Sequence, residues 1–531
     1  MPLSLSAEAD LQWLCSSVGL SLIVASTFVL YAAAITVYRL TWHPLADFPG
    51  PRIARATYLY ELWFDVILKG RFTREVSRLH EIYGPIVRIN PDEIHFNDPS
   101  FVDTIYAHGR ARARRDKAPH YLAGMPWCRP KASFGTADHD HHRLRRAPIS
   151  KYFSRSRILK FEGLFHENTK RLCDKLLSYG DEPFEVAAAF SCLTTDTLVS
   201  YCFGHGLGNL DRPGWKPTFK GTIDNITSLS YLCRYFKLLA GLADWMPLYV
   251  CRCISSDVGS LVGMIRVTIP QLVIRAGKTY RSDGHLTFPQ AILESNLPPS
   301  EKVPKRLISE TTAVVLGGTH SVSMVLSIIT YHLLANPNLL ERLRTELKAT
   351  LSEGDGQPTW VTLEKLPYLS AIVLEGLRLM YGVASRIPVV VPDEELVYQV
   401  PSEYSSASKQ ARTCYKIPRG TVIGISAYAV HMNPTLFPNP SHFLPDRWFD
   451  EQGQRNRSLE RHLLSFSKGN RQCVGMQLAN CELYIATANL ALRVWPQMSL
   501  YRTTIEDVEY DHDQLLSVPK AGSKGVRVVM H

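Results

Sequence analysis

The amino-acid sequence predicts a mainly α-helical soluble domain with small β-sheets, preceded by one N-terminal transmembrane helix. Residues 11–38 contain no charged side chain, and such a stretch is long enough to cross a bilayer as a helix. Helical patterns dominate residues 138–291, and a long helix that is apolar on most faces is expected at residues 301–335. Strand-like runs are short and no linker is apparent, so the chain of 531 residues is expected to hold one large soluble domain.

The flanks of the apolar stretch favour an uncleaved membrane anchor over a cleaved signal peptide. A signal peptide has a shorter apolar region that follows positive charge. Here Glu8 and Asp10 precede the stretch and Arg39 follows it. The positive-inside rule then leaves the C-terminal bulk in the cytosol. We therefore expect an anchor at residues 1–43 and the soluble domain at residues 44–531.

Composition narrows the classes of partner. The chain carries 59 Lys and Arg against 49 Asp and Glu, a formal net charge of +10. A basic balance favours an acidic redox protein, anionic lipid or nucleic acid. No zinc spacing, RNA-binding signature or basic-aromatic interleaving is present, so no nucleic-acid partner is expected. The 11 cysteines are odd in number and irregularly spaced, which favours a reducing compartment over a disulfide framework.

Several shorter elements are expected around the long helix. The prolines of residues 43–54 predict a stiff, non-helical hinge between the membrane and the domain. A further helix is expected at residues 368–379, and residues 402–412 are expected to form an inserted polar loop. Strands are expected at residues 86–96, 386–392 and 421–428.

One apolar segment, residues 238–250, has two interpretations. It can be a buried core segment, or a loop that dips into the bilayer with Trp245 and Tyr249 at the interface. The sequence favours neither.

The stretch "FSKGNRQCVG" frames Cys473 in a way that no other cysteine shares. An apolar helix is expected directly after it, and the free N–H groups at a helix start lower a thiol pKa. Gly469 and Gly475 permit a tight turn close to a flat macrocycle. Arg471 can pair with a carboxylate on that macrocycle and Phe466 can cover the sulfur. A thiolate in such a frame can bind haem iron and favour O–O cleavage. The alternative is an inert buried cysteine at a helix start.

This stretch resembles the F-x-x-G-x-R-x-C-x-G signature of the cytochrome P-450 family, the haem-thiolate monooxygenases, at all five fixed positions. The resemblance extends from the anchor to about Val518. Residues 38–54 and 79–96 are similar to membrane-bound fungal members that tailor secondary metabolites, including the trichodiene oxygenase-like group. It implies the cytochrome P-450 fold, with heme b as cofactor and Cys473 as axial metal ligand.

Three further residues resemble the family's Glu-Arg-Arg triad. Glu375 and Arg378 are three residues apart, hence on one face of a predicted helix. Arg447 follows about seventy residues later. The resemblance implies a buried charge network that locks the cysteine loop against the core. A common surface salt bridge is the alternative for the pair alone.

Candidates for the haem propionates come from "HHRLRR" and from Arg386 in "ASRIPVVVP". His141 and Arg145 lie one helical turn apart and resemble the family's propionate-binding helix. The neighbouring Arg143 and Arg146 are expected to form a solvated basic face that receives an acidic electron donor. A wholly solvated face is the alternative for all four residues.

The stretch "LGGTHSVSM" on the long helix resembles the family's oxygen-activation motif. Gly317 and Gly318 would open a groove for dioxygen. His320 replaces the usual acid, Ser321 the usual threonine, and Val322 the second hydroxyl. A serine can still relay a proton and a histidine can supply one. The departure nonetheless predicts weaker coupling of oxygen reduction to substrate oxidation.

Together these features predict a monooxygenase that inserts one oxygen atom of O₂ into an apolar small molecule, a terpenoid or polyketide intermediate of fungal secondary metabolism. Ser321 and His320 are the candidate catalytic residues. The resemblance implies electrons from NADPH-cytochrome P-450 reductase, with cytochrome b5 as an optional second donor, at the endoplasmic reticulum membrane. Two alternatives stay open: a haem-thiolate protein that binds ligand without turnover, and a reductase-independent haem isomerase or dehydratase.

Overall fold

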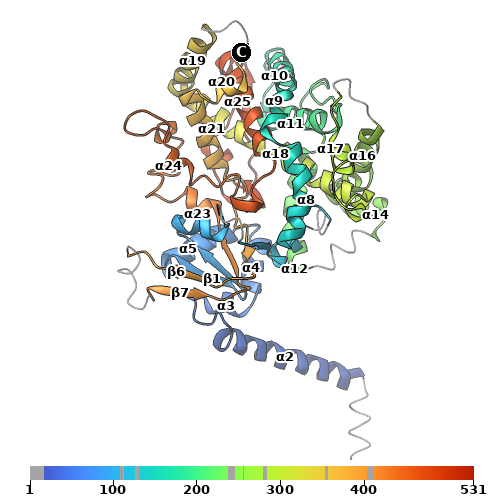
Figure 1. Ribbon diagram of the computed structural model, residues 1–531, viewed down its shortest axis with the longest axis vertical. Helices are drawn as coiled ribbons and strands as arrows, with labels where there is room; N and C mark the ends of the chain where they lie inside the picture. The colour runs from blue at the N-terminus through green and yellow to red at the C-terminus, as the bar shows by residue number, and fades with distance from the viewer. Residues whose placement is uncertain are drawn as a thin grey trace, which may run out of the picture.

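The computed structural model describes residues 17–107, 109, 113–125, 131–236, 245–254, 256–278, 284–352, 357–402 and 412–531. Helices make up most of the molecule, the largest sheet lies at one end of it, and another small sheet packs against the helical core (Figure 1). Helix α2 (Ser17–Thr41) projects away from the sheet end. The mainly helical architecture with small sheets is the one that the sequence predicts.

The helices follow the predicted order along the chain. The expected helix at residues 368–379 is α21, and the expected helix after Cys473 is α25. After α2, the α-helices that the structure describes are α3 (Arg52–Ala56), α4 (Leu59–Leu62), α5 (Phe72–Tyr83), α6 (Val102–Ile105), α7 (Pro119–Ala123), α8 (His139–Tyr152), α9 (Arg155–Lys160), α10 (Glu162–Leu177), α11 (Val186–Phe203), α12 (Lys220–Tyr235), α14 (Leu248–Ile254), α15 (Ser256–Gly263), α16 (Ile269–Lys278), α17 (Phe288–Leu293), α18 (Pro304–Ala335), α19 (Pro337–Ser352), α20 (Trp360–Leu363), α21 (Pro367–Met380), α23 (Ala427–His431), α24 (Arg457–Glu460) and α25 (Met476–Arg493).

The largest sheet has five strands in the order β1-β2-β8-β5-β3. The predicted turn at Asn90 and Pro91 joins β1 and β2 as an antiparallel pair, and β8 runs parallel to β2. Three smaller groups, β4-β12-β9, β10-β11 and β6-β7, complete the sheet structure. The strands are β1 (Ile86–Asn90), β2 (Glu93–Phe96), β3 (Asp116–Lys117), β4 (Phe184–Glu185), β5 (Val389–Val390), β6 (Leu396–Gln399), β7 (Cys414–Ile417), β8 (Val422–Ile425), β9 (Met498–Leu500), β10 (His512–Gln514), β11 (Leu516–Val518) and β12 (Arg527–Met530).

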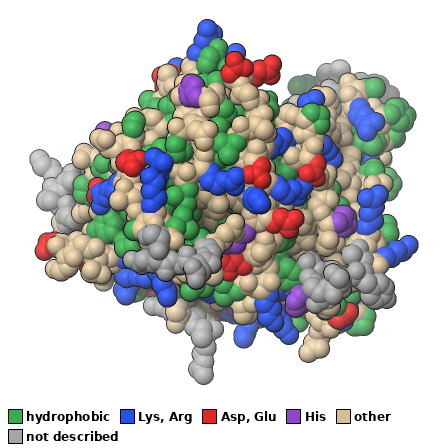
Figure 2. All heavy atoms as spheres, turned by 90° about the horizontal axis from the view of Figure 1, so that it is seen from above, with side chains coloured by type: hydrophobic (Ala, Val, Ile, Leu, Met, Phe, Trp, Pro, Cys, Tyr) green, Lys and Arg blue, Asp and Glu red, His purple; other side chains and the backbone are tan. Residues whose placement is uncertain are grey.

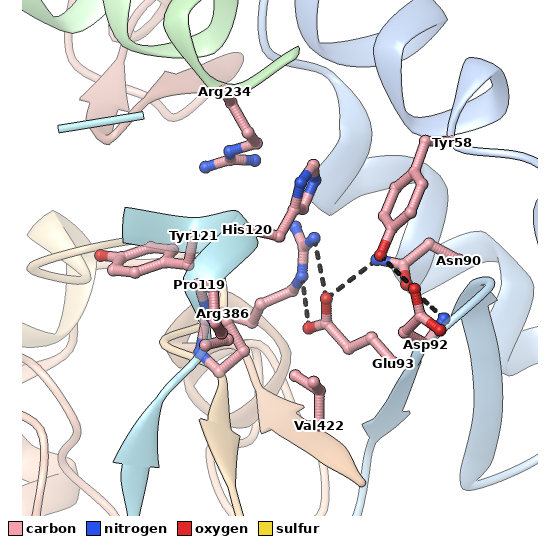
Figure 3. Close-up of a pocket in the computed structure, with 12 residues that line it drawn as sticks. Tyr58, Asn90, Asp92, Glu93, Pro119, His120, Tyr121, Arg234, Arg386 and Val422 are labelled. Carbon is pink, nitrogen blue, oxygen red and sulfur yellow. Dashed lines mark hydrogen bonds and ion pairs between the residues drawn. The ribbon is translucent and has the colours of Figure 1, made fainter. Parts of the chain in front are cut away.

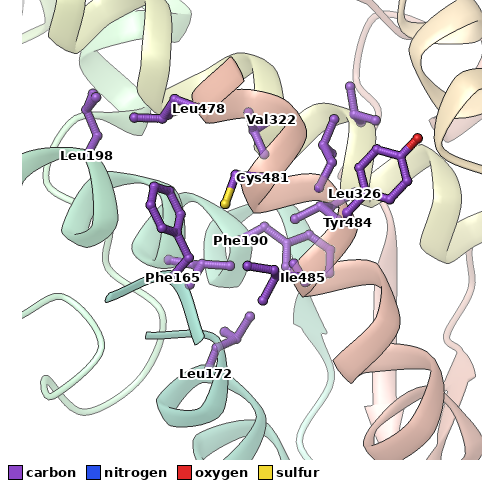
Figure 4. Packing of buried hydrophobic residues seen from close by; sticks show 14 of the residues in the cluster. Phe165, Leu172, Phe190, Leu198, Val322, Leu326, Leu478, Cys481, Tyr484 and Ile485 are labelled. Carbon is purple, nitrogen blue, oxygen red and sulfur yellow. The ribbon is translucent and has the colours of Figure 1, made fainter. Parts of the chain in front are cut away.

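The long predicted helix is α18, which passes through the helical part of the molecule beside α11 (Figure 1). Thr194 on α11 donates a hydrogen bond to the carbonyl of Thr319 at 2.6 Å. Side chains of α10, α11, α18 and α25 interdigitate in the main hydrophobic core (Figure 4). Burying a Leu or Phe side chain in such a core is worth about 1.5–3 kcal/mol, so this packing holds α18 and α25 in fixed relative positions.

Helix α2 is exposed in the way that a membrane anchor requires. Residues Gly19–Thr41 are long and apolar enough to span a bilayer, and none of their most apolar window is buried in the protein. Three other helices in the described part of the chain also meet the length and composition criteria, but the corresponding windows of α11 and α18 are 89% and 61% buried. Core packing explains the apolar character of those two helices, whereas α2 fits a single transmembrane helix.

The connection from α2 to the sheet differs from the expected hinge. Helix α3 begins at Arg52, directly after Pro51. Phe48 is buried, and the guanidinium of Arg88 on β1 donates to the carbonyls of Arg39 and Leu45 at 2.9 and 3.0 Å. Proline is well tolerated at a helix start, so the prolines do not prevent α3 from forming. The segment packs on the domain and is not a separate hinge.

Part of the segment at residues 238–250 lies outside the described residues, as does most of the expected loop at 402–412. In the described part, Trp245 is 90% exposed and Tyr249 is 70% exposed. Exposed aromatic side chains of this kind suit a membrane interface better than a core.

The end of the molecule seen from above in Figure 2 carries Lys and Arg side chains among Asp, Glu and hydrophobic ones. On this face, the Lys and Arg side chains are therefore interspersed with other types and do not form one continuous basic patch.

Candidate functional site

Cys473 sits on a tight loop directly before α25. Its backbone N–H donates to the carbonyl of Phe466 at 2.9 Å, which closes the loop. Gly469 has a φ of +67°, and a Cβ there would lie 2.0 Å from the carbonyl oxygen of Tyr106. Only glycine fits that position. Protein atoms surround the thiol of Cys473, but the residue keeps exposed surface on this loop.

The surroundings of Cys473 act on its pKa in two directions. Burial raises the pKa of the thiol, while the backbone N–H groups of Gly475 and Met476 and the charge of Arg146 lower it. The helix start acts as the sequence predicts, but burial outweighs it. An adjacent metal cation would reverse the balance, because a coordinated thiol loses its proton.

The sulfur of Cys473 would serve as a single metal ligand, since the described part of the chain places it in no cluster of protein ligands. Among the residues that the structure describes, no three His, Cys, Asp or Glu side chains are placed to hold a metal ion. A closed cage of the structural-zinc type therefore does not account for Cys473. A single cysteine ligand instead suits a metal whose other ligands come from a macrocycle.

Arg471, two residues before the cysteine, lies where the sequence predicts a cofactor contact. Its Nη1 and Nη2 donate to the carbonyls of Thr136 and Ala137 at 2.7 and 2.6 Å. Burial lowers the pKa of its guanidinium to about 10. Its Nε is buried and has no hydrogen-bond partner among the described residues. This side chain is therefore a fixed cation with one donor to spare.

The two propionate candidates on α8 turn to a different partner. His141 Nε2 and Arg145 Nε each donate to the carboxylate of Glu301 at 2.7 Å. Arg145 also donates to Thr136 Oγ1 at 2.9 Å. These bonds tie α8 to the turn before α18, and they give His141 and Arg145 a structural partner that the sequence analysis did not foresee.

The next residues along α8, His142 and Arg146, lie toward the cysteine loop: the charge of Arg146 acts on Cys473, and that of Arg471 acts on His142. Arg146 Nη2 donates to the carbonyl of Gln472 at 2.6 Å. The pKa of His142 is lowered to about 2, first by burial and then by the charges of Arg471, Lys117 and Arg146. The structure thus gathers four basic residues beside the cysteine loop, and it takes Arg146 away from the expected solvated face.

The third propionate candidate, Arg386, is held in a carboxylate cluster. Its Nε donates to Glu93 at 2.7 Å and its Nη2 to Glu61 at 2.6 Å. Those two carboxylates match its charge, so its described contacts give a structural reason for its burial. The propionate role of Arg386 stays a prediction that these contacts do not support.

The predicted triad is assembled, and its Glu375–Arg378 pair is fully buried. Arg378 forms a two-pronged pair with Glu375 at 2.7 and 2.9 Å, and Arg447 Nε reaches the same carboxylate at 3.1 Å. Trp448 Nε1 and the backbone N–H of Leu444 donate to Glu375 at 2.9 Å. Glu375 and Arg378 have no exposed surface, so the pair is not the surface salt bridge that the spacing alone allowed.

His431 joins the triad to the cysteine loop, and sequence reasoning missed it. Its Nδ1 lies 2.8 Å from the carbonyl of Arg378, and its Nε2 accepts from the backbone N–H of Leu464 at 2.8 Å. Because Nε2 accepts, the proton is assigned to Nδ1. Leu464 precedes Phe466 by two residues, so the network of Arg378 reaches the loop that holds Cys473. No local sequence pattern marks His431 for this role.

The oxygen-motif residues lie mid-way along α18. Ser321 Oγ donates to the carbonyl of Gly317 at 3.0 Å, and the carbonyl of His320 accepts from Ser323 Oγ at 2.7 Å. A Cβ on Gly317 would meet no described atom within 4 Å, so open space lies beside it.

Gly318 differs from its neighbour. A Cβ on Gly318 would lie 2.8 Å from Leu198 Cδ2 on α11. Gly317 therefore fits the expected groove, whereas Gly318 allows two helices to pack closely.

These features fit a thiolate-bound haem. An exposed cysteine lies at the start of a helix, Arg471 has a spare buried donor, and His142, Arg146 and Lys117 add further basic groups for two propionates. Gly317 leaves space beside α18. A site of this kind defines the class of haem-thiolate proteins.

Comparison with known proteins places the chain within that class. Residues 49–494 match the family description "Cytochrome P450". A solved structure described as a cytochrome P450, CYP102L1, superposes with a TM-score of 0.67 over 91% of this chain and 98% of that chain, at 15% identity. The chain therefore belongs to the cytochrome P450 family, whose members hold haem on a cysteine thiolate.

Curated relatives are fungal monooxygenases. "Cytochrome P450 monooxygenase ppzE" of Metarhizium majus is 44% identical over 83% of this chain and 94% of that protein. "Cytochrome P450 monooxygenase TRI4" of Fusarium sporotrichioides is 32% identical over 96% of each chain. "Tryptophan 6-hydroxylase fscE" of Fusarium equiseti is 34% identical, again over 96% of each. The predicted resemblance to fungal secondary-metabolite enzymes is confirmed, and the chain is a haem-dependent monooxygenase of this family.

Proposed function

We propose that this monooxygenase inserts one oxygen atom of O₂ into an apolar intermediate of fungal secondary metabolism, a terpenoid or polyketide, and that Cys473 is its axial haem ligand. The observation that carries the assignment is the exposed Cys473 at the start of α25, beside four buried or partly buried basic residues. The haem supplies the activation of dioxygen.

The chain's own residues position the reactants. Arg471, Arg146 and Lys117 would hold the two haem carboxylates as cations, since a fixed cation binds a carboxylate strongly away from water. The neutral ring of His142 would donate one N–H beside them. Phe466 packs against the main core, and its backbone carbonyl accepts a hydrogen bond from the N–H of Cys473, so it orients the loop. The triad and His431 fix the position of that loop through hydrogen bonds to its backbone.

Ser321 and His320 are proposed to deliver protons beside Gly317. The hydroxyl of Ser321 donates to the carbonyl of Gly317, which is the bond that a serine makes when it stabilises a helix turn. Rotation about χ1 would turn the same hydroxyl to a neighbouring acceptor. The imidazole of His320 is a proton source near neutral pH.

The proposed partners are a membrane-bound NADPH-cytochrome P-450 reductase, with cytochrome b5 as an optional donor, at the endoplasmic reticulum. Residues 1–43 would form the anchor and residues 44–531 the catalytic domain in the cytosol. A chain truncated before Ala46 should lose most of its membrane attachment. Asn225 and Asn456 should carry no glycan in microsomes, and a glycan on either would reverse the proposed orientation.

Dependence on NADPH and reductase tests the proposed reaction. Extracted metabolites of a gene-deleted strain and its parent, compared by mass spectrometry, supply the substrate. Purified protein should then convert that substrate only when NADPH and reductase are both present. Conversion without them would favour the isomerase or dehydratase, and binding without conversion would favour the ligand-binding protein that the altered "GGTHS" suggests.

A further inference from the structure

A cavity of about 220 Å³ lies between the five-stranded sheet, α7 and α12 (Figure 3). Tyr58 and Tyr121 stand on opposite sides of it, and Arg234 enters from α12. Its apolar wall is formed by Ala118, Pro119, Pro388 and Val422. The cavity thus combines an apolar floor with a charged edge, which is the usual make-up of a small-molecule site.

The carboxylate oxygens at this edge already accept hydrogen bonds from protein groups, so they do not require a ligand. Both oxygens of Glu93 accept bonds, from Arg386 at 2.7 Å and from Asn90 at 3.0 Å. Behind it, one oxygen of Glu61 accepts from Arg386 and the other from Asn90. A cationic ligand would therefore have to displace bonds that already exist.

Donor capacity remains on Arg234. Its Nη1 donates to Asp65 at 2.8 Å and to Glu61 at 3.3 Å. Its Nε is buried and has no hydrogen-bond partner in the described part of the chain, although the residue is only 4% exposed. A buried donor without an acceptor costs about 1–3 kcal/mol. An acceptor oxygen on a ligand would remove that cost.

The charge around the cavity selects a neutral acceptor. Arg234 and Arg386 supply two positive charges, while Glu61, Glu93 and Asp92 supply three negative ones. Asp65 also lies beside Arg234, but burial raises its pKa to about 7. A carboxylate would add a fourth anion to this cluster. The oxygen of a neutral amide or ketone accepts the same hydrogen bond without that repulsion.

The lining of the cavity is connected to α18, the helix that carries Gly317. Ala118 and Tyr121, which line the cavity, belong to a small hydrophobic cluster, and Ala313 of α18 packs against that cluster. Val422 also touches this cluster. Ala313 precedes Gly317 by four residues, one helical turn. One hydrophobic cluster therefore links the lining of the cavity to the turn of α18 that precedes Gly317.

We propose that this cavity binds a neutral carbonyl oxygen of the substrate, as in a ketone, lactone or amide, through Arg234 Nε, with the apolar body of the molecule resting on Tyr121 and Val422. The inference rests on the proposed function and names the polar group that its substrate carries. It makes Arg234 a substrate-recognition residue, distant from the oxygen-activating centre.

The test compares three probes that share one apolar body. 4-Phenylbutyramide, 4-phenylbutyrate and butylbenzene are titrated by calorimetry into full-length haem-loaded protein. The amide should bind at least about tenfold more tightly than either other probe, since one hydrogen bond to a charged group is worth about 1.5–3 kcal/mol. Equal affinity for the three probes, or preference for the carboxylate, overturns the proposal.

Two variants locate the binding. Val422→Phe fills the cavity from its apolar wall, and Arg234→Lys keeps the charge beside Asp65 and Glu61 but removes the Nε donor. Each should weaken amide binding about tenfold, while Val397→Phe on exposed β6 should not. Unchanged amide affinity in Val422→Phe overturns the proposal even if the lysine variant fails to fold.

The carbon monoxide spectrum separates this test from that of the proposed function. An abnormal spectrum in the unaltered protein counts against Cys473 as ligand, whereas the order of probe affinities is measured without any turnover.

Discussion

Leu464 donates its backbone N–H to His431 at 2.8 Å, which couples a buried imidazole to the loop that carries Cys473. The opposite ring nitrogen meets the carbonyl of Arg378. One side chain therefore completes the path from the Glu-Arg-Arg triad to the cysteine loop.

Replacing this ring should loosen the loop. His431→Leu would leave the Arg378 carbonyl and the Leu464 N–H buried without partners, at about 1–3 kcal/mol each. We expect a lower melting temperature and a smaller haem content per protein, measured by calorimetry and by absorbance. The exposed His442→Leu is the control and should change neither. A fully haem-loaded His431→Leu protein with an unchanged melting temperature would contradict the coupling.

His431 should also make stability depend on pH. Burial lowers its pKa from 6.5 to about 3, so the unfolded chain binds more protons than the folded one between those values. Stability should therefore fall as pH drops below about 6.5. Denaturant midpoints at pH 7 and pH 5 check this, and the His431→Leu variant should show a shallower loss. The same slope in both proteins would remove His431 as a contributor.

Cys473→Ser should abolish the far-red-shifted Soret band of the reduced, carbon monoxide-bound protein, because that band reports a thiolate ligand. The exposed Cys414 on β7 provides the matched control, Cys414→Ser. Cys481 is a poor control because it lies within the core packing of Figure 4. A normal band in Cys473→Ser would end the assignment.

Glu375→Ala should prevent assembly of most haem-loaded protein. It leaves Arg378 and Arg447 without their shared anion, and breaking such a buried pair costs about 3–5 kcal/mol. Glu341, which is paired with Arg344 at an exposed site, is the control, and Glu341→Ala should cost at most about 1 kcal/mol. Yields, haem content and urea midpoints of the two variants decide the matter, and equal effects would refute the special role of Glu375.

The rate of haem release can distinguish the role of Arg146 from that of Arg145 on α8. Arg146→Ala should speed haem transfer to apomyoglobin about tenfold or more, since a charge-assisted bond is worth about 1.5–3 kcal/mol. Arg145→Ala should lower the melting temperature through Glu301 without a matching change in the release rate. The reverse result would restore Arg145 as the propionate ligand and return Arg146 to the surface.

Ser321→Ala should keep haem, substrate binding and NADPH consumption but divert electrons to hydrogen peroxide, because proton delivery is slowed. Ser309 makes the same backbone bond on the same helix, to Lys305 at 3.0 Å. Ser309→Ala therefore controls for the loss of a helix-turn bond. The measurement is product formed per NADPH consumed. An unchanged ratio in Ser321→Ala would remove Ser321 from the mechanism.

His320→Asp tests the neighbouring residue. This change should preserve or improve the ratio if His320 does the work of the usual acid. A lower ratio in His320→Asp would indicate that the histidine has a different function.

Features written in short local patterns were predictable from the sequence. The frame of Cys473, the spacing of Glu375 and Arg378, and the strand pair at residues 86–96 all depend on neighbours within ten residues. Local chemistry determines such elements, so the sequence alone is sufficient to place them.

Features decided by distant partners were not predictable. His141 and Arg145 are one helical turn apart, and so are His142 and Arg146, but Glu301, 156 positions from Arg145, binds the first pair. Arg386 meets a carboxylate 293 positions away, and Gly318 faces Leu198 on another helix. The spacing of two residues along a helix predicts whether their side chains share a face. It does not predict which distant residue each side chain will contact.

The bonds from Arg88 to the carbonyls of Arg39 and Leu45 have a mechanical consequence. The last turn of the anchor is clasped by a strand of the five-stranded sheet, so the domain cannot swivel freely about its tether without breaking them. An anchored enzyme of this build keeps one end, the sheet with its cavity, close to the lipid surface. A substrate dissolved in the bilayer would then meet the same side of the protein on every encounter.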